Sequence, residues 1–367
     1  MDGVLLEPRG YYIALRTSVQ RIGMALGAPQ VQITEEQIAR FEAAHVTNEW
    51  DTLAICSAII LVHLWRYEPT LRIDEIKPRT PVIPYESPDF DHFLDQLTDG
   101  GQLPGLAAYD TICAQTPWLD HSQKTHLKMI LENCRNVYSS PTLPAYLETV
   151  LGSQLFHECY GLEPQFGIEG CLTQYDRPII TSRKHTELLE WLVRPNHYAG
   201  IMTNRPNQTP DGYVSPPEAE LGLRLVDFES LPFIGSGTLA WFAIRHTQYP
   251  AHTYAKPHPA HFLSLIQFIL GKELVDALQT AVDLCEGNGN PLDWQDLDGA
   301  QIIIFEDSTK GLLSGLESQK ILQRLGFYVD LKLIGVSTNP IKLNALEPIT
   351  TYNIANINHI NWNTVFL

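Results

Sequence analysis

Four short groups of polar residues stand beside apolar runs that we expect to form strands, or just before a helix. They are Asp2 near the start, Thr203 and Asn204 at the end of YAGIMT, Lys256 in KPHP, and Glu306 and Asp307 after QIIIF. Together they provide carboxylates, a hydroxyl, an amide and an ammonium group. A phosphoryl group carries negative charge on three oxygens, so its transfer depends mainly on positioning and charge compensation. The set therefore indicates phosphoryl transfer.

Each kind of side chain has a role in such a reaction. One carboxylate can attack phosphorus and form an aspartyl-phosphate. A second carboxylate can protonate the leaving oxygen and later activate water. A hydroxyl and an ammonium group can hold the phosphoryl oxygens. An acidic pair can bind Mg²⁺, which takes carboxylates together with phosphate oxygens.

The segment that must position these residues begins near residue 178, where strand-like and helical stretches start to alternate. Strands are predicted at 198–203, 231–234, 301–305 and 333–337. The alternation predicts a parallel sheet with helices on both faces. Ligands of such sheets bind at the carboxyl ends of the strands, which is where Thr203 and Glu306 stand.

The residues before 178 are predicted to be mostly helical, because apolar residues recur at helical spacing and strand signals are scarce. Thr34-Glu35-Glu36-Gln37 is typical of a capping box that starts a helix. The predicted helices are 11–26, 34–44, 51–65, 89–97, 105–115, 122–133 and 144–158.

The four polar groups, taken in order, resemble the motifs of the haloacid dehalogenase superfamily of Mg²⁺-dependent phosphatases. The matching segments are MDGVLL, IMTNRP (201–206), KPHP (256–259) and FEDSTKG (305–311). The resemblance implies an α/β fold, with a Rossmann-like parallel sheet core formed by 1–9 and 178–367. It also implies a large inserted all-helical cap over 10–177, as in the phosphoglycolate phosphatase-like branch, where the cap is usually much smaller.

The resemblance also implies a role for each residue. Asp2 is expected to be the general acid and base, with its backbone carbonyl reaching Mg²⁺. Thr203 is expected to hydrogen-bond the phosphoryl group, with the substrate-binding amide of Asn204 nearby. Lys256 is expected to neutralise charge on the nucleophile and on the phosphoryl group.

The cofactor that the resemblance implies is Mg²⁺, held by Asp307 with Glu306 directly or through water, and by Asp2. The implied substrate is a small phosphorylated metabolite, hydrolysed as a phosphomonoester through an aspartyl-phosphate. In the helical segment, Glu49 and Trp50 are candidates for recognising the leaving group. The alternative is a helix start there, with Asn48 or Asp51 as the cap and Trp50 packed in the core.

The first motif departs from the family pattern. Asp2 aligns with the second Asp of Asp-x-Asp-Gly and Met1 with the position between, so the nucleophile falls before Met1. We expect that the sequence starts at an internal Met and that a longer chain carries the nucleophile. The alternative is a catalytically inactive relative that binds a phosphorylated ligand or a partner. A phosphomutase or a dehalogenase is also compatible with the family, although a dehalogenase has no use for the acidic pair at 306–307.

Two further patterns allow other readings. Residues 235–240 (GSGTLA) have the form of a dinucleotide fingerprint and would suit a nicotinamide-dependent oxidoreductase. The acidic residue expected about 20 positions later is absent, which favours a tight turn. Four histidines, His246, His252, His258 and His261, suggest a zinc site, but their spacing matches no compact ligand pattern and favours solvated or hydrogen-bonded side chains.

Composition excludes several classes. The 367 residues carry 25 Lys and Arg against 42 Asp and Glu, a formal charge of −17. An acidic chain is a poor candidate for binding nucleic acid or an anionic membrane. The longest nearly apolar stretch, 53–65, is too short to span a bilayer. No secretory signal is evident and the six cysteines are widely spaced, so a cytoplasmic location with reduced thiols is expected.

Overall fold

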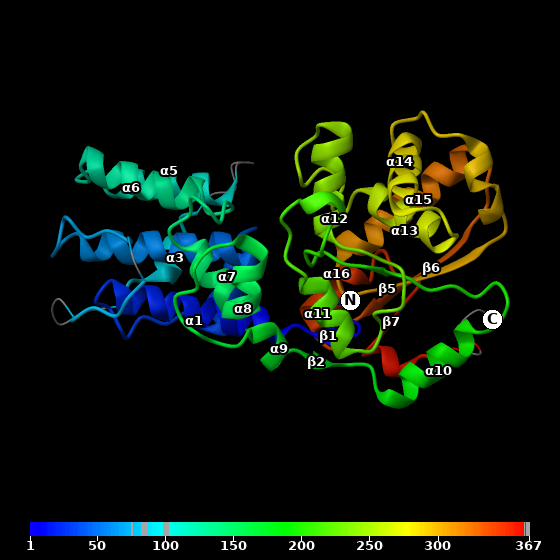
Figure 1. The fold of residues 1–367 in the computed structure, drawn as a ribbon, viewed down its shortest axis with the longest axis horizontal. Coiled ribbons are helices and arrows are strands. Elements are labelled where there is room, and N and C mark those ends of the chain that lie inside the picture. Colours follow the sequence, from blue (N-terminus) through cyan, green and yellow to red (C-terminus); the bar gives the residue numbers. More distant parts are fainter. Residues whose placement is uncertain (75, 82–86, 98–102, 363, 365–367) are drawn as a thin grey trace. The chain divides into compact units, whose positions relative to one another are not determined.

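The computed structural model describes residues 1–74, 76–81, 87–97, 103–362 and 364. The protein has a mixed α/β fold with small parallel sheets and many helices. The predicted α/β class is confirmed. The chain divides into two compact units. One comprises Met1–Pro8 and Asp176–Leu367, and the other comprises Arg9–Tyr175. Both units are drawn in Figure 1.

The second unit is built from helices. They are α1 (Arg9–Ala25), α2 (Glu35–Ala43), α3 (Glu49–Leu64), α4 (Phe90–Leu94), α5 (Pro104–Gln115), α6 (His121–Glu132), α7 (Leu143–Leu151), α8 (Ser153–Tyr160) and α9 (Cys171–Tyr175). The capping box predicted at Thr34 and Gln37 is present, with both reciprocal hydrogen bonds. The single helix predicted over 144–158 is wrong, because Gly152, at φ 87°, ends α7 and starts a new helix.

The first unit contains the strands. An antiparallel pair joins β1 (Leu6–Glu7) to β2 (Arg177–Pro178), and a parallel pair joins β3 (Ile201–Met202) to β4 (Phe233–Ile234). A three-stranded parallel sheet has the order β5 (Gln301–Glu306), β6 (Asp330–Val336), β7 (Tyr352–Ile354). The apolar run at 301–305 is thus a strand as predicted. The strand predicted over 198–203 is shorter than expected, because only its residues 201 and 202 pair with β4.

The helices of the first unit surround these strands. They are α10 (Ser182–Leu192), α11 (Glu218–Leu225), α12 (Ser236–Phe242), α13 (Pro259–Ile269), α14 (Leu274–Cys285), α15 (Thr309–Arg324) and α16 (Pro340–Leu346). Short helical segments of other types occur at Pro210–Gly212, Ala243–Thr247, Pro291–Leu297 and Ile357–His359.

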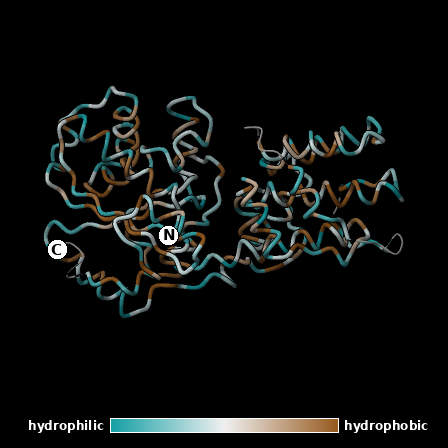
Figure 2. Tube along the Cα trace, turned by 180° about the vertical axis from the view of Figure 1, so that it is seen from behind, coloured by the Kyte–Doolittle hydropathy of each residue, from teal (hydrophilic) through white to brown (hydrophobic). Residues whose placement is uncertain are grey.

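Two hydrophobic clusters lie on opposite faces of the strands. Helices α12 to α15 pack on one face with Met202 and Ile304. On the other face α10, α11 and the C-terminal segment pack with Ile201 and Phe305 (Figure 1). Hydrophobic stretches of the chain run through the interior of this unit (Figure 2). Since β3 and β5 contribute alternate residues to the same two clusters, both belong to one layer.

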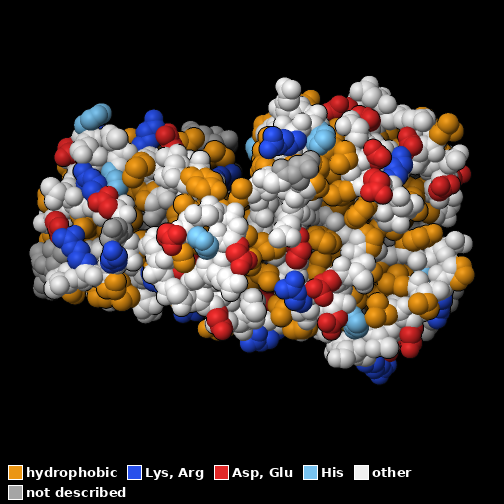
Figure 3. All heavy atoms as spheres, viewed as in Figure 1, with side chains coloured by type: hydrophobic (Ala, Val, Ile, Leu, Met, Phe, Trp, Pro, Cys, Tyr) orange, Lys and Arg blue, Asp and Glu red, His pale blue; other side chains and the backbone are white. Residues whose placement is uncertain are grey.

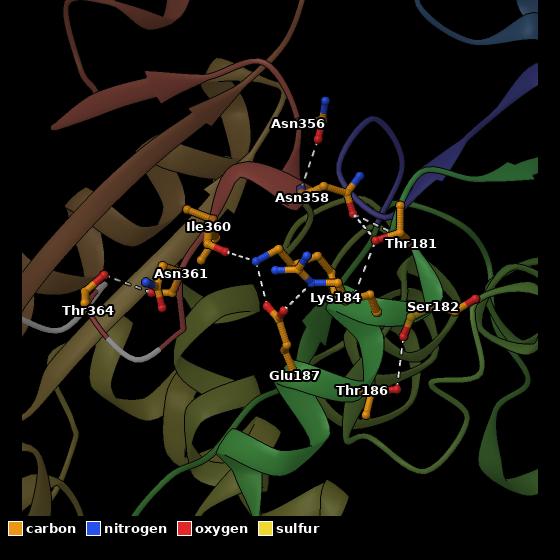
Figure 4. A network of polar contacts seen from close by, with 11 residues as sticks. Thr181, Ser182, Lys184, Thr186, Glu187, Asn356, Asn358, Ile360, Asn361 and Thr364 are labelled. Carbon is orange, nitrogen blue, oxygen red and sulfur yellow. Dashed lines mark hydrogen bonds and ion pairs between the residues drawn. The ribbon is translucent and has the colours of Figure 1, made fainter.

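The C-terminal segment is attached to α10 by a polar network (Figure 4). Lys184 donates from Nζ to Glu187 Oε2 and to the carbonyl of Ile360, both at 2.6 Å. Asn358 Oδ1 accepts from the backbone N–H of Thr181 at 2.8 Å. These bonds fix the segment that leads to Trp362, whose side chain is buried against the same face of the sheet.

The surface carries both signs of charge. On the face seen in Figure 3, Lys and Arg side chains lie scattered among Asp and Glu rather than in one basic patch. In the described part of the chain, no helix combines the length and apolar character that crossing a membrane requires.

Candidate active site

A buried ion pair lies at the carboxyl ends of β3 and β5. Lys256 Nζ donates to Glu306 Oε1 and to the backbone carbonyl of Met202, the latter at 3.3 Å. The two charged side chains are 5% and 6% exposed. Ser308, the N-cap of α15, donates from Oγ to the other oxygen of Glu306 at 3.1 Å. The chain therefore brings a fixed ammonium group to the point where both strands end.

Thr203 stands beside this pair, directly after β3. Its backbone N–H donates to the carbonyl of Ile234 on β4, and its Oγ1 accepts from the backbone N–H of Arg205. The residue is 2% exposed. Because Oγ1 is fixed as an acceptor, its proton is directed elsewhere and can be donated. The neighbouring Asn204 is exposed, and its role in substrate binding stays a prediction.

Arg205 joins Asp2 to this strand end, and the sequence patterns did not identify it. Its Nε donates to both oxygens of Asp2, at 2.9 and 3.0 Å, and its Nη2 lies 2.6 Å from Asp2 Oδ1. Nη2 also donates to Asp176 Oδ2 at 2.7 Å. Arg205 and Asp176 are almost fully buried, whereas the Asp2 side chain is 31% exposed. The planar guanidinium thus orients the carboxylate predicted to act as acid and base.

Asp307 lies against the segment that contains Asp2. A Cβ placed on Gly3 would lie 2.3 Å from Asp307 Oδ2, and Gly3 has φ +69°, so only glycine fits there. Asp307 Oδ2 also accepts from Lys342 Nζ at 2.7 Å. Lys342, in the first turn of α16, is a second residue that the motifs did not indicate. No pattern near Lys342 in the sequence predicts its contact with Asp307.

The amino group of Met1 is buried close to the same charges. Burial, and then the positive charge of Lys256, lower the pKa of this group, while Glu306, Asp2 and Asp307 raise it. The charged residues that the sequence predicted in three separate segments therefore share one electrostatic neighbourhood.

The donor set is suited to Mg²⁺ in part. Among the residues that the structure describes, no three His, Cys, Asp or Glu side chains gather as a metal-binding group. Mg²⁺ in phosphoryl-transfer sites commonly takes only one or two carboxylates, with water and substrate oxygens completing the shell. Asp307 can supply one such carboxylate: its side chain is 19% exposed and packs where a Cβ on Gly3 would lie. Glu306 is occupied by Lys256 and Ser308.

Glu49 and Trp50 lie in the helical unit, in the first turn of α3, and both are partly exposed. The helix start given as the alternative is present, with Asn48 at the N-cap position of α3, although the Asn48 side chain makes no cap hydrogen bond. Asp51 is fully buried and is bound by Nε and Nη2 of Arg135. The role of Glu49 and Trp50 in recognising a leaving group stays a prediction.

The glycines of residues 235–240 are used for close packing. A Cβ on Gly237 would lie 2.2 Å from Ser215 Oγ and 2.3 Å from the carbonyl oxygen of Asn207. Asn207 Oδ1 accepts from the backbone N–H of Thr238, in the first turn of α12. The helix start that a dinucleotide would use is thus covered by the chain's own residues, which supports the turn interpretation.

The four histidines have separate local roles. His258 caps α13 by accepting from Ala260 N–H, and His246 stacks on Phe242. His261 is fully buried with Nε2 bonded to the carbonyl of Ile234; burial and the charge of Lys256 lower its pKa to about 3. His252 is exposed. Among the described residues they form no metal-binding group.

Comparisons with known proteins add a likeness in fold. The chain matches no protein-family model and no curated protein. A crystal structure determined as a target of the Northeast Structural Genomics Consortium is similar, with a TM-score of 0.66 and 15% sequence identity. The match covers 97% of this chain and 94% of that one. At this identity the likeness concerns the fold alone.

Proposed function

We propose that the strand ends of the first unit form the site of a Mg²⁺-dependent phosphomonoester hydrolase acting on a small phosphorylated metabolite. The observation that carries the proposal is the position of Lys256. Its ammonium group is fixed by Glu306 and by the carbonyl of Met202, the residue that directly precedes the buried Thr203. An ammonium and a hydroxyl at the end of the same parallel strand suit the binding of phosphoryl oxygens.

Each residue has a definite task in the proposed reaction. A carboxylate attacks phosphorus as the bond to the leaving oxygen breaks, and Asp2 gives that oxygen its proton. Asp2 then takes a proton from water, whose oxygen attacks phosphorus, releasing orthophosphate and restoring the carboxylate. Arg205 keeps Asp2 in place, and Lys256 and Thr203 hold the phosphoryl oxygens. Mg²⁺, when bound by Asp307 and the backbone near Asp2, supplies further compensation of negative charge.

In the family that the chain resembles, the attacking carboxylate lies two positions before the residue that corresponds to Asp2. The strand that carries it lies at the centre of that family's sheet. The strand pairings support this arrangement. In the described part of the chain, β3 pairs only with β4 and β5 pairs only with β6, so β3 and β5 do not pair with each other. The two strands nevertheless share one layer. An added apolar strand that ends in Asp and is joined to Met1 is therefore expected to lie between them.

Hydrolysis of p-nitrophenyl phosphate tests the proposal. The chain extended before Met1 by a short apolar strand and an Asp, so that it reads Asp-Met-Asp-Gly, is expected to release p-nitrophenol only with Mg²⁺. The same extension ending in Asn is the matched control and should be inactive. Equal rates with Asp and Asn, or no Mg²⁺-dependent rate in either, would contradict the proposal.

A second candidate function is binding of a phosphorylated ligand without hydrolysis. It is favoured by one observation: each of the three carboxylates already contacts a basic side chain, as the pairs Asp2–Arg205, Glu306–Lys256 and Asp307–Lys342 show. In this case the chain binds orthophosphate, while the extended chain with Asp stays inactive.

A further inference from the structure

The ion pair between Asp307 and Lys342 differs from the other ion pairs of the site. The Lys256–Glu306 and Arg205–Asp176 pairs are formed by side chains that are at most 6% exposed. The Lys342 side chain is 54% exposed and reaches Asp307 from solvent, at 2.7 Å. An exposed lysine gains little from one such contact and loses side-chain entropy, so this cation is the one that exchanges most easily.

The position of Lys342 in its helix points in the same direction. Asn339 caps α16 and its Oδ1 accepts from the backbone N–H groups of Ile341 and Lys342. A cation in the first turn of a helix is disfavoured by the partial positive charge of the helix N-terminus. Lys342 is therefore placed where its own helix does not stabilise it and where Asp307 does.

We propose that Lys342 is a tethered counter-ion that occupies Asp307 in the absence of a metal and that a divalent cation must displace. The inference rests on the metal site of the proposed function and goes beyond it, because it assigns a competing residue to that site. The exchange replaces the single positive charge at Asp307 with the two charges of the cation. It also frees the Lys342 ammonium for an anionic ligand at the same strand end.

Direct titration with Mn²⁺, read from the electron paramagnetic resonance signal of the free ion, tests this on the full chain. Lys342→Gln is expected to tighten Mn²⁺ binding about two- to fivefold, the range of an exposed ion pair. Lys342→Arg keeps the competing charge and should bind no tighter than wild type. Lys310→Gln is the matched control, since Lys310 is exposed, lies three residues from Asp307 and has no ion pair among the described residues.

The outcomes separate this inference from the function on which it rests. Equal Mn²⁺ affinity in wild type and Lys342→Gln, with binding lost in Asp307→Asn, overturns the role of Lys342 and leaves the metal site. Equal tightening in Lys342→Gln and Lys310→Gln also overturns it, because the effect is then one of net charge. Binding that Asp307→Asn does not weaken, or no binding in any variant, removes the metal site and the inference together.

Discussion

Lys256 and Glu306 form an ion pair whose side chains are almost completely withdrawn from water. Such a pair contributes little net stability when complete, because desolvation of both charges offsets their attraction. Its loss is costly when only one partner is removed. The pair therefore fixes the ammonium group in one position at the end of β3, which is what a phosphoryl-binding site requires.

Removal of one partner is expected to expose this asymmetry. Lys256→Met should lower the free energy of unfolding by about 3–5 kcal/mol, because Glu306 remains buried without its cation. The double variant Lys256→Met with Glu306→Gln should recover part of this loss, since the amide carries no charge. Urea denaturation of the three proteins gives the values. A single variant as stable as wild type would show that the pair does not exist as described.

Arg205 is expected to tolerate no replacement by lysine. Its guanidinium contacts Asp2 and Asp176 at the same time, and a single ammonium group cannot reproduce that fork. Arg205→Lys should cost about 2–4 kcal/mol, because Asp176 is fully buried. Arg224→Lys, which changes an exposed pair with Glu229, should stay within about 0.5 kcal/mol. Similar thermal unfolding of both variants would argue against the proposed orientation of Asp2.

Replacing Gly3 with Ala is expected to cost more stability than the same replacement of a glycine with a similar backbone conformation. Gly299 has φ +77° and nothing within 4 Å of an added Cβ, so Gly299→Ala should cost only about 1–2 kcal/mol of backbone strain. Gly3→Ala adds a collision with Asp307 and should cost clearly more, about 3 kcal/mol. It should also weaken Mn²⁺ binding. Equal losses of stability, with Mn²⁺ affinity unchanged, would separate Gly3 from the site.

The helical unit should lose stability in acid through His126. Its Nε2 accepts from the backbone N–H of Ile73, and burial, then Arg72, lower its pKa to about 4 from 6.5. Between pH 6.5 and 4 the unfolded state binds the extra proton, so stability falls as pH falls, by up to about 1.4 kcal/mol per pH unit. His126→Gln should reduce this slope, and the exposed His121→Gln should not. An unchanged slope in His126→Gln would refute the assignment.

Local sequence signals predicted those elements that form from their own residues. The continuous apolar run at 301–305 is β5, and the Thr34 capping box starts α2. Elements whose pairing depends on distant residues were harder to predict. β1 and β2 have two residues each, and the sequence between these paired strands contains the whole helical unit. β3 is reduced to Ile201 and Met202 because only these meet β4. The predicted cap role of the helical unit stays a prediction.

The site divides in the same way. Thr203, Lys256 and Glu306 could be chosen because each follows a recognisable strand or stands in a recognisable motif. Arg205 was overlooked because its importance comes from Asp2 and Asp176, which only the fold brings to it. Lys342 shows its relation to Asp307 only in three dimensions. The assignments of Mg²⁺ and of a phosphorylated metabolite stay predictions.

The most direct test of whether these strand ends form one phosphoryl site is the binding of orthophosphate to the chain. Isothermal titration calorimetry measures this binding once with Mg²⁺ and once with EDTA. We expect binding that requires Mg²⁺, that Thr203→Val weakens about tenfold through loss of a hydrogen bond to a charged group, and that Thr203→Ser largely retains. Asp307→Asn should abolish the Mg²⁺-dependent binding, because it removes the carboxylate proposed to hold the metal. No binding of orthophosphate, or binding that neither Thr203→Val nor Asp307→Asn changes, would contradict the account.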